Sequence, residues 1–158
     1  MRDLTIIMPV YNEHEVVNGV ILEWIKTLDN LGIDYIIISY NDGSTDNTLE
    51  ELTKIDNDRL RVVNKRNSGH GPTILKGYLY AESSWIFQVD SDNEISPDQF
   101  EKIWISRINK DFVIGKRVGR DFVVSRILVS LIARLSVLIL YGRGIEDVNC
   151  PFRLFSRD

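Results

Sequence analysis

Cysteine is nearly absent from this chain of 158 residues, because Cys150 is the only one. A single thiol excludes a disulfide within the chain and is typical of a reducing compartment. An excess of positive charge is also absent. The formal net charge is −4, which argues against general nucleic-acid binding, and we expect no nucleic-acid partner. No basic segment or cleavage site precedes the first apolar run, residues 4–10, so no signal peptide is predicted.

The remaining composition is that of an ordinary globular protein, with 44% apolar and 27% charged residues. The length suits one domain spanning residues 1–158, and no repeat, linker or low-complexity segment divides it. Short runs rich in Ile and Val indicate strands, and segments with apolar residues at helical spacing follow them. The expected strands are residues 4–10, 35–40, 60–63, 85–89 and 112–115. This alternation predicts an α/β fold, a mostly parallel sheet with helices on both faces.

The fourth expected strand carries the strongest chemical signal. It is expected to end at Asp90 and Asp92, with Glu94 next in the same alternating series. Carboxylates on one side of a strand end repel one another unless a cation lies between them. Mg²⁺ commonly takes one or two carboxylates together with substrate phosphates, so these three residues are candidate metal ligands. The alternative is a solvated loop that leads into the next helix, for which Ser96 and Pro97 form a suitable entry.

Polar and glycine-rich residues also follow the other expected strands. The carboxyl ends of parallel strands lie at one edge of a sheet, where ligands bind. Carboxylates, guanidinium groups and glycines gathered there suit a diphosphate and its metal. The alternative is that loops are simply polar and that the glycines make turns. The residues concerned are Tyr11, Glu13, Asp42, residues 66–71, Asp90 to Glu94, Lys116 and Arg117.

Five motifs stand in order along the chain: Met-Pro-Val-Tyr-Asn-Glu (8–13), Asn-Asp-Gly-Ser-Thr-Asp (41–46), Gly-His-Gly-Pro (69–72), Val-Asp-Ser-Asp (89–92) and Gly-Lys-Arg (115–117). In order and in strand context, they resemble the motifs of the inverting family 2 glycosyltransferases, which have the GT-A fold. The resemblance covers essentially the whole chain. The ending Glu-Asp-Val-Asn-Cys-Pro-Phe-Arg-Leu-Phe (146–155) resembles the branch that makes polyprenyl-phosphate sugars, typified by dolichyl-phosphate mannosyltransferase.

The resemblance implies a site for a UDP- or GDP-linked sugar. Tyr11 would offer a ring face, Glu13 an acceptor for the ribose and Asp42 a contact to the base edge. The family usually has a second aspartate where this chain has Asn41, which leaves the base contact open. The full set of implied nucleotide-sugar ligands is Pro9, Tyr11, Glu13, Asn41, Asp42, Arg66, Gly69 and Asp90.

The resemblance further implies catalytic roles for Asp90, Asp92 and Asp147. The first two would bind the sugar diphosphate together with Mg²⁺ or Mn²⁺. Glu94 would be a third ligand, although the dolichyl enzymes commonly carry glutamine there. His70 is expected in a loop as a positioning residue, with a role as a base as the alternative. Asp147 would remove a proton if the acceptor is a sugar hydroxyl, and the alternative for it is a helix or turn cap.

Residues 122–141 are the second informative segment. They predict an amphipathic helix in which Arg126, Ser130 and Arg134 lie four apart on one face, while Leu, Ile and Val cover the rest. Arginines inside the segment disfavour a membrane span, so the helix is expected either to pack on the sheet or to lie in a membrane interface. The resemblance implies that Arg117, Arg126, Ser130 and Arg153 bind the phosphate of the acceptor. Arginine suits this task because its fork pairs bidentately with phosphate oxygens.

The implied reaction is transfer of a sugar from a nucleotide diphosphate to a lipid-linked phosphate, with inversion, by a cytoplasmic protein bound peripherally to the membrane face. Two alternatives stay open: transfer to a sugar hydroxyl in polysaccharide synthesis, and a non-catalytic subunit that binds nucleotide sugars. A phosphatase of the haloacid dehalogenase type is disfavoured because its Asp-x-Asp pair follows the first strand rather than the fourth. Family members continue beyond Asp158, so we expect the chain to lack its C-terminal continuation.

Overall fold

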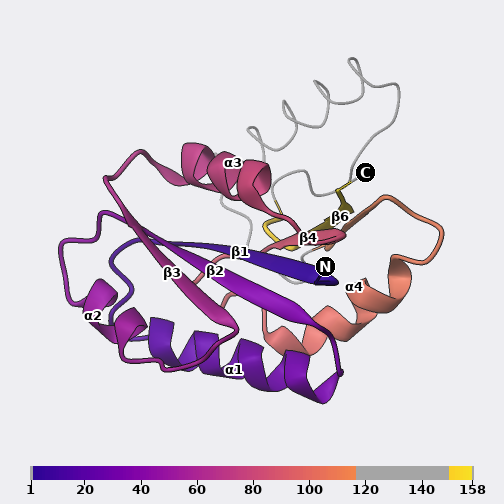
Figure 1. The fold of residues 1–158 in the computed structure, drawn as a ribbon, viewed down its shortest axis with the longest axis horizontal. Helices are drawn as coiled ribbons and strands as arrows, with labels where there is room; N and C mark the ends of the chain where they lie inside the picture. Colours follow the sequence, from indigo (N-terminus) through magenta and orange to yellow (C-terminus); the bar gives the residue numbers. More distant parts are fainter. Residues whose placement is uncertain (1, 117–149, 158) are drawn as a thin grey trace, which may run out of the picture.

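The computed structural model of the protein describes residues 2–116 and 150–157. Strands and helices alternate through most of the chain, as predicted (Figure 1). In chain order the elements are β1 (Leu4–Val10), α1 (Val17–Asn30), β2 (Tyr35–Asp42), α2 (Thr48–Thr53), β3 (Leu60–Lys65), α3 (His70–Tyr80), β4 (Trp85–Gln88), the short 3₁₀ helix η1 (Pro97–Gln99), α4 (Phe100–Ser106), β5 (Phe112–Ile114) and β6 (Arg153–Ser156).

The strands form one sheet in the order β3-β2-β1-β4-β6-β5. Strand β1 pairs in parallel with β2 and β4, and β2 pairs in parallel with β3. Strand β6 runs antiparallel to both of its neighbours, β4 and β5. The predicted α/β fold with a mostly parallel sheet is therefore confirmed, and the antiparallel β6 adds to it.

Helices cover both faces of the sheet, as the sequence predicted. Helices α1, α2 and α4 lie on one face and α3 lies on the other (Figure 1). Strand β1 is buried along its whole length, because a central strand with helices on both sides has no solvated face. Helix α1 turns one apolar side to the sheet, with Val17, Val20, Ile21, Trp24, Ile25 and Leu28 buried.

A cluster of aromatic rings fills the core between the sheet and α1. The ring of Phe87 lies 5.5 Å from that of Trp24, 4.8 Å from that of Phe100 and 4.7 Å from that of Phe152, centroid to centroid. All four side chains are buried. Tilted and edge-on ring pairs at these distances add to the stabilisation given by burial. The cluster therefore fixes the segment that leads into β6 against the centre of the sheet.

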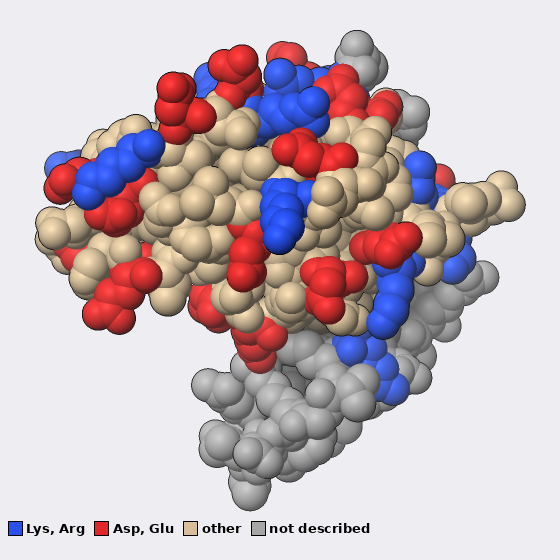
Figure 2. Space-filling view, turned by 90° about the horizontal axis from the view of Figure 1, so that it is seen from below, with Lys and Arg blue, Asp and Glu red and all other residues tan. Residues whose placement is uncertain are grey.

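The surface seen from below the view of Figure 1 carries acidic and basic side chains side by side (Figure 2).

Within residues 2–116 and 150–157, no helix is long and apolar enough to cross a membrane. The amphipathic helix predicted at residues 122–141 lies outside the described residues.

Two element ends differ from what sequence spacing alone indicates. Asn12 and Glu15 have the spacing of a capping box, but α1 begins at Val17 and no side chain caps it. Asn12 instead accepts a hydrogen bond from the Thr45 amide at 2.8 Å. Strand β4 ends at Gln88, before the carboxylates that were expected to terminate it.

Candidate functional site

A hollow of about 290 Å³ lies where the carboxyl ends of β1, β2 and β4 meet the start of α3. This is the edge at which parallel sheets of this kind bind ligands. We call it the rim pocket. Its lining residues are Pro9, Val10, Tyr11, Glu13, Asp42, Asn67, Gly69, His70, Asp90, Ser91 and Asp92.

One wall of the rim pocket depends on Asp42, the last residue of β2. Its carboxylate accepts hydrogen bonds from the amides of Ser68 and Gly69, both at 2.9 Å, and forms an ion pair with Lys65. Burial alone would raise the pKa of Asp42, but the hydrogen bonds from Lys65 and the Ser68 amide outweigh it and lower the pKa. Asp42 is thus an ionised acceptor held at the pocket wall.

The paired carboxylates Asp90 and Asp92 lie in the loop after β4, and both line the rim pocket. Asp92 Oδ1 accepts a hydrogen bond from the Glu94 amide at 2.9 Å. The side chain of Glu94 does not line the pocket. Because β4 has already ended, the alternation of side chains along a strand does not apply to this segment, and Glu94 does not join Asp90 and Asp92 in the lining of the pocket. Within the described residues, no three His, Cys, Asp or Glu side chains are grouped to hold a metal ion.

His70 meets Asp90 across the pocket. The residue was expected in a loop but is the first residue of α3. Its Nε2 lies 3.0 Å from Asp90 Oδ1. This hydrogen bond is the main reason why the pKa of His70 is raised above 6.5, and the charge of Arg153 acts in the opposite sense. The contact fits the predicted role of His70 as a positioning residue, because it fixes one oxygen of Asp90.

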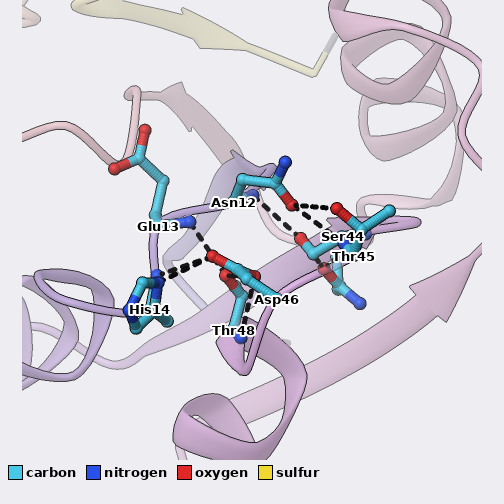
Figure 3. A network of polar contacts seen from close by, with 8 residues as sticks. Asn12, Glu13, His14, Ser44, Thr45, Asp46 and Thr48 are labelled. Carbon is cyan, nitrogen blue, oxygen red and sulfur yellow. Dashed lines mark hydrogen bonds and ion pairs between the residues drawn. The ribbon is translucent and has the colours of Figure 1, made fainter.

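A polar network joins the loop after β1 to the loop after β2 (Figure 3). The Asn12 amide donates to Ser44 Oγ at 3.0 Å, and the Thr45 amide donates to Asn12 Oδ1 at 2.8 Å. The backbone of Asn12 has a φ of 55°, in the left-handed region that asparagine tolerates. These contacts fix the backbone between Tyr11 and Glu13, two of the residues predicted to hold the nucleoside.

The same network continues through Asp46 (Figure 3). Asp46 Oδ2 lies 2.8 Å from His14 Nδ1, and Asp46 Oδ1 accepts from both the amide and the hydroxyl of Thr48. Thr48 Oγ1 in turn accepts from the Glu13 amide at 2.8 Å. Burial alone would raise the pKa of Asp46, but its bonds from Thr48 and His14 hold the pKa well below its usual value. The backbone of Glu13 is therefore tied to the start of α2.

Negative charge accumulates at the pocket. Burial raises the pKa of Glu13, and the charges of Asp92 and Asp46 raise it further. Such repulsion is relieved by a cation. Asp90 and Asp92 supply the hard oxygen ligands that Mg²⁺ and Mn²⁺ prefer, and two carboxylates leave coordination positions for phosphate oxygens. The residues present therefore fit a divalent cation that is shared with a diphosphate.

The structure brings most of the predicted nucleotide-sugar residues together and excludes two. Asn41 is buried, donates to Asn64 Oδ1 at 2.9 Å and accepts from the Ser44 hydroxyl, so it builds the loop rather than the pocket. Arg66 is exposed and does not line the pocket. The six that do line it are Pro9, Tyr11, Glu13, Asp42, Gly69 and Asp90.

Asn67 and Ser91 also line the pocket, and both lie inside segments that the sequence had indicated, residues 66–71 and 90–94. Sequence reasoning missed Lys65, which lies behind the lining. Lys65, at the end of β3, lies outside those segments.

Arg153 is the one residue of the predicted acceptor set that lies in the described part of the chain. It begins β6, and its Nε donates to the Cys150 carbonyl at 2.8 Å. Its charge opposes the rise in the pKa of His70, so it lies within electrostatic reach of the pocket. The others, Arg117, Arg126 and Ser130, and the predicted catalytic Asp147, lie outside the described residues.

The sequence model of glycosyl transferase family 2 matches residues 5–156, which is nearly the whole chain. The chain belongs to glycosyl transferase family 2. A dolichyl-phosphate beta-glucosyltransferase of Trichomonas vaginalis is 29% identical over 174 residues, which cover 98% of this chain and 52% of that protein. An undecaprenyl-phosphate 4-deoxy-4-formamido-L-arabinose transferase of Proteus mirabilis is 27% identical over 162 residues, covering 99% of this chain and 50% of that protein.

These relatives confirm the predicted resemblance to the polyprenyl-phosphate branch of the family. The chain spans about half the length of the curated relatives it matches.

Solved structures confirm the GT-A fold. Mannosyl-3-phosphoglycerate synthase from Rubrobacter xylanophilus superposes with a TM-score of 0.75 at 14% identity, covering 99% of this chain and 53% of that one. Glucosyl-3-phosphoglycerate synthase from Mycobacterium tuberculosis, in complex with Mn²⁺, UDP and phosphoglyceric acid, superposes with a TM-score of 0.73 at 19% identity. The superposition covers 99% of this chain and 56% of that one.

Proposed function

We propose that this chain is the donor-binding and catalytic domain of an inverting glycosyltransferase that moves a sugar from a nucleotide diphosphate to a polyprenyl phosphate. The observation that carries the proposal is the rim pocket, which gathers Tyr11, Glu13 and Asp42 with the carboxylates Asp90 and Asp92. An aromatic face, fixed acceptors and paired carboxylates are the groups that a base, a ribose and a metal-bound diphosphate require.

The nucleoside would bind between the loops after β1 and β2. The Tyr11 side chain lines the pocket, and the residue is 48% exposed, so its ring face is free to stack on a base. Glu13 would accept from a ribose hydroxyl, and Asp42 would accept from an N–H of the base. Hydrogen bonds hold both residues in place, from the Glu13 amide to Thr48 and from the Gly69 amide to Asp42.

Asp90 and Asp92 would hold Mg²⁺ or Mn²⁺, which when bound would neutralise charge on the leaving diphosphate. The residues around these two carboxylates would hold them in the orientation that the metal requires. His70 fixes one oxygen of Asp90, and the Glu94 amide fixes one oxygen of Asp92. The Mn²⁺ and UDP bound by the structurally similar synthase from M. tuberculosis support this assignment.

The acceptor would be a lipid-linked phosphate, as the names of the curated relatives suggest. Arg153 supports this because its positive charge acts on His70, which lines the rim pocket. We propose that Arg117, Arg126 and Ser130 complete the acceptor site at a cytoplasmic membrane face. A phosphate is already ionised at neutral pH, so this transfer needs no strong general base. Asp147 would be needed as a base only in the alternative, transfer to a sugar hydroxyl.

Thermal unfolding with added nucleotides tests the donor site. UDP, GDP and their sugar conjugates are each added with Mn²⁺, with Mg²⁺ or with chelator. A ligand that binds only the folded state adds about 2.7 kcal/mol of stability at 100 times its Kd, which gives a visible shift of the midpoint. We expect metal-dependent stabilisation by one nucleoside diphosphate, and we expect Asp92→Asn to remove it.

Asp98→Asn is the matched control, because Asp98 is a nearby aspartate, in η1, that does not line the pocket. No stabilisation of the wild type by any nucleotide would rule out the donor site. If Asp92→Asn and Asp98→Asn lose the stabilisation by nucleotide equally, the loss results from the change in net charge rather than from the missing Asp92 carboxylate. Transfer from the stabilising sugar nucleotide to undecaprenyl or dolichyl phosphate, compared with transfer to free sugars, then separates the two acceptor classes.

A further inference from the structure

Lys65 lies behind the rim pocket and does not line it. It is the last residue of β3, as Asp42 is the last residue of β2, and the two are register partners in the parallel pair. Their side chains are 12% and 5% exposed and form an ion pair. A buried lysine is rarely left without full compensation for its charge.

The ammonium group of Lys65 has three donors, and three acceptors surround it. They are Asp42 Oδ1, Ser68 Oγ at 2.7 Å and Thr73 Oγ1 at 3.0 Å. Asp42 belongs to β2, Ser68 to the loop after β3 and Thr73 to the first turns of α3. One side chain thus joins the three segments that form this wall of the pocket.

The effect of Lys65 reaches the pocket through Asp42. Besides the lysine, the Asp42 carboxylate accepts the amides of Ser68 and Gly69, which set the course of the loop. Asp42 and Gly69 both line the pocket. Without the lysine, the carboxylate would be buried without its cation, and such a group either takes up a proton or moves toward solvent.

We infer that Lys65 is a positioning residue of the nucleotide pocket, which holds the Asp42 carboxylate at the wall as a fixed hydrogen-bond acceptor. This inference rests on the proposed function, since it assumes that the pocket takes a nucleotide. The pKa of Asp42, lowered by the hydrogen bond from Lys65 and by that from the Ser68 amide against the effect of burial, agrees with the geometry.

A fixed carboxylate at the wall restricts which bases the pocket can bind, because an ionised carboxylate only accepts hydrogen bonds. Uracil at N3 and guanine at N1 present a ring N–H, whereas cytosine at N3 and adenine at N1 present a lone pair that repels a carboxylate and donate only through the neighbouring amino group. Asp42 therefore favours uridine and guanosine diphosphates over those of cytidine and adenosine, and Lys65 maintains that preference.

Calorimetric titration tests this inference with UDP, GDP, CDP and ADP, and with pyrophosphate as a probe that has no base, all in the presence of Mn²⁺. For Lys65→Met we expect about a tenfold or larger loss of affinity for the nucleotide that the wild type prefers, the range for a hydrogen bond to a charged group. The preference over CDP and ADP should shrink with it. Pyrophosphate should bind to Lys65→Met as it does to the wild type.

Lys76→Met is the matched control, because Lys76 is an exposed lysine of α3 that does not line the rim pocket. Asp42→Asn should reproduce the loss, and adding Lys65→Met to it should change the affinity little further. Lys65→Arg keeps the charge but not the compact ammonium, so it should recover part of the preference. If Lys65→Met does not fold, Thr73→Val removes one of the three acceptors and should reduce the preference in smaller measure.

The outcomes separate the two proposals. If the wild type binds none of the nucleotides, the proposed function fails. If the wild type binds and the Lys65 and Thr73 variants keep its base preference, the inference about Lys65 is overturned. A parallel loss of pyrophosphate binding in Lys65→Met would also overturn it, because it would show general damage to the pocket.

Discussion

The Nε2 atom of His70 lies 3.0 Å from Oδ1 of Asp90, which joins the first residue of α3 to the loop after β4. Both side chains line the rim pocket. Because one oxygen of Asp90 is occupied, the direction in which the carboxylate offers its remaining lone pairs is fixed. In metal sites, partners of this kind orient the ligand, and losing one typically weakens metal binding by about 10- to 100-fold.

We expect His70→Ala to weaken binding of a Mn²⁺–nucleotide complex by about tenfold or more, the usual effect of losing such a partner. His70→Gln should lose less, because its amide can still donate to Asp90. Calorimetric titration at fixed pH measures both. His14→Ala is the control, since the only other histidine bonds to Asp46 and does not line the pocket. Equal losses in His70→Ala and His14→Ala would contradict the role given to the contact with Asp90.

Glu13→Gln is expected to stabilise the ligand-free protein at neutral pH. Burial and the charges of Asp92 and Asp46 raise the pKa of Glu13 in the folded state, so its ionised carboxylate destabilises the fold. The folded state binds the proton more tightly than the unfolded chain. The destabilisation is therefore absent below the unfolded pKa of about 4.3 and is complete once the pH exceeds the raised pKa. The gain in thermal midpoint over wild type should accordingly vanish as the pH falls to about 4.

The same variant should bind nucleotide less well, since Glu13 is the proposed ribose acceptor. Glu15→Gln changes net charge equally, at an exposed position two residues away that does not line the pocket. It should alter neither the midpoint nor the nucleotide affinity appreciably. Equal stabilisation by both variants would mean that the negative charge of the whole chain, rather than the neighbours of Glu13, is responsible.

The sheet and most of the pocket could be predicted because they depend on local patterns. Apolar runs such as Tyr35–Asp42 are strands buried on both faces, and parallel strands bring the loops at their carboxyl ends to one edge of the sheet. That rule was sufficient to find Tyr11, Asp42 and Asp90. It could not place β6, because β6 follows both β4 and β5 in the sequence but lies between them in the sheet.

The predicted site residues that lie outside the pocket lining do so where the exact end of a strand decides which way a side chain points. Strand β2 extends through Asn41 and Asp42, and neighbouring residues of a strand face opposite sides, so only one of them could reach the pocket. Strand β4 stops at Gln88, so the alternation expected to align Glu94 with Asp92 had already ended. Lys65 was missed because burial of a lysine depends on acceptors from three separate segments.

Thr48→Val tests the network that fixes Glu13. The Thr48 hydroxyl is buried, accepts from the Glu13 amide at 2.8 Å and donates to Asp46 Oδ1. Valine keeps the shape but leaves the amide without its acceptor, so the free energy of unfolding should fall by about 1–3 kcal/mol in a urea titration. Thr48→Ser should retain most of the stability. Thr53→Val is the control, because its exposed hydroxyl bonds only within α2, to the Glu50 carbonyl. If Thr53→Val lowers the free energy of unfolding as much as Thr48→Val does, the hydrogen bonds of Thr48 to Glu13 and Asp46 are not the cause of the loss.

Gly77 and Gly19 should respond in opposite directions to the same substitution, because both are helical but only one is in close packing. A Cβ at Gly77 would lie 2.5 Å from Ile7 Cγ2, and the β-branched isoleucine cannot easily turn that methyl away. Gly77→Ala should therefore push α3 from β1 and lower the free energy of unfolding by about 1–3 kcal/mol. Gly19→Ala meets nothing within 4 Å in α1 and should raise it by about 0.5–1 kcal/mol through helix propensity. Because α3 begins with His70, Gly77→Ala should also weaken nucleotide binding, whereas Gly19→Ala should not. If Gly77→Ala and Gly19→Ala both stabilise the protein, the position of α3, and of His70 at its start, does not depend on close contact with β1.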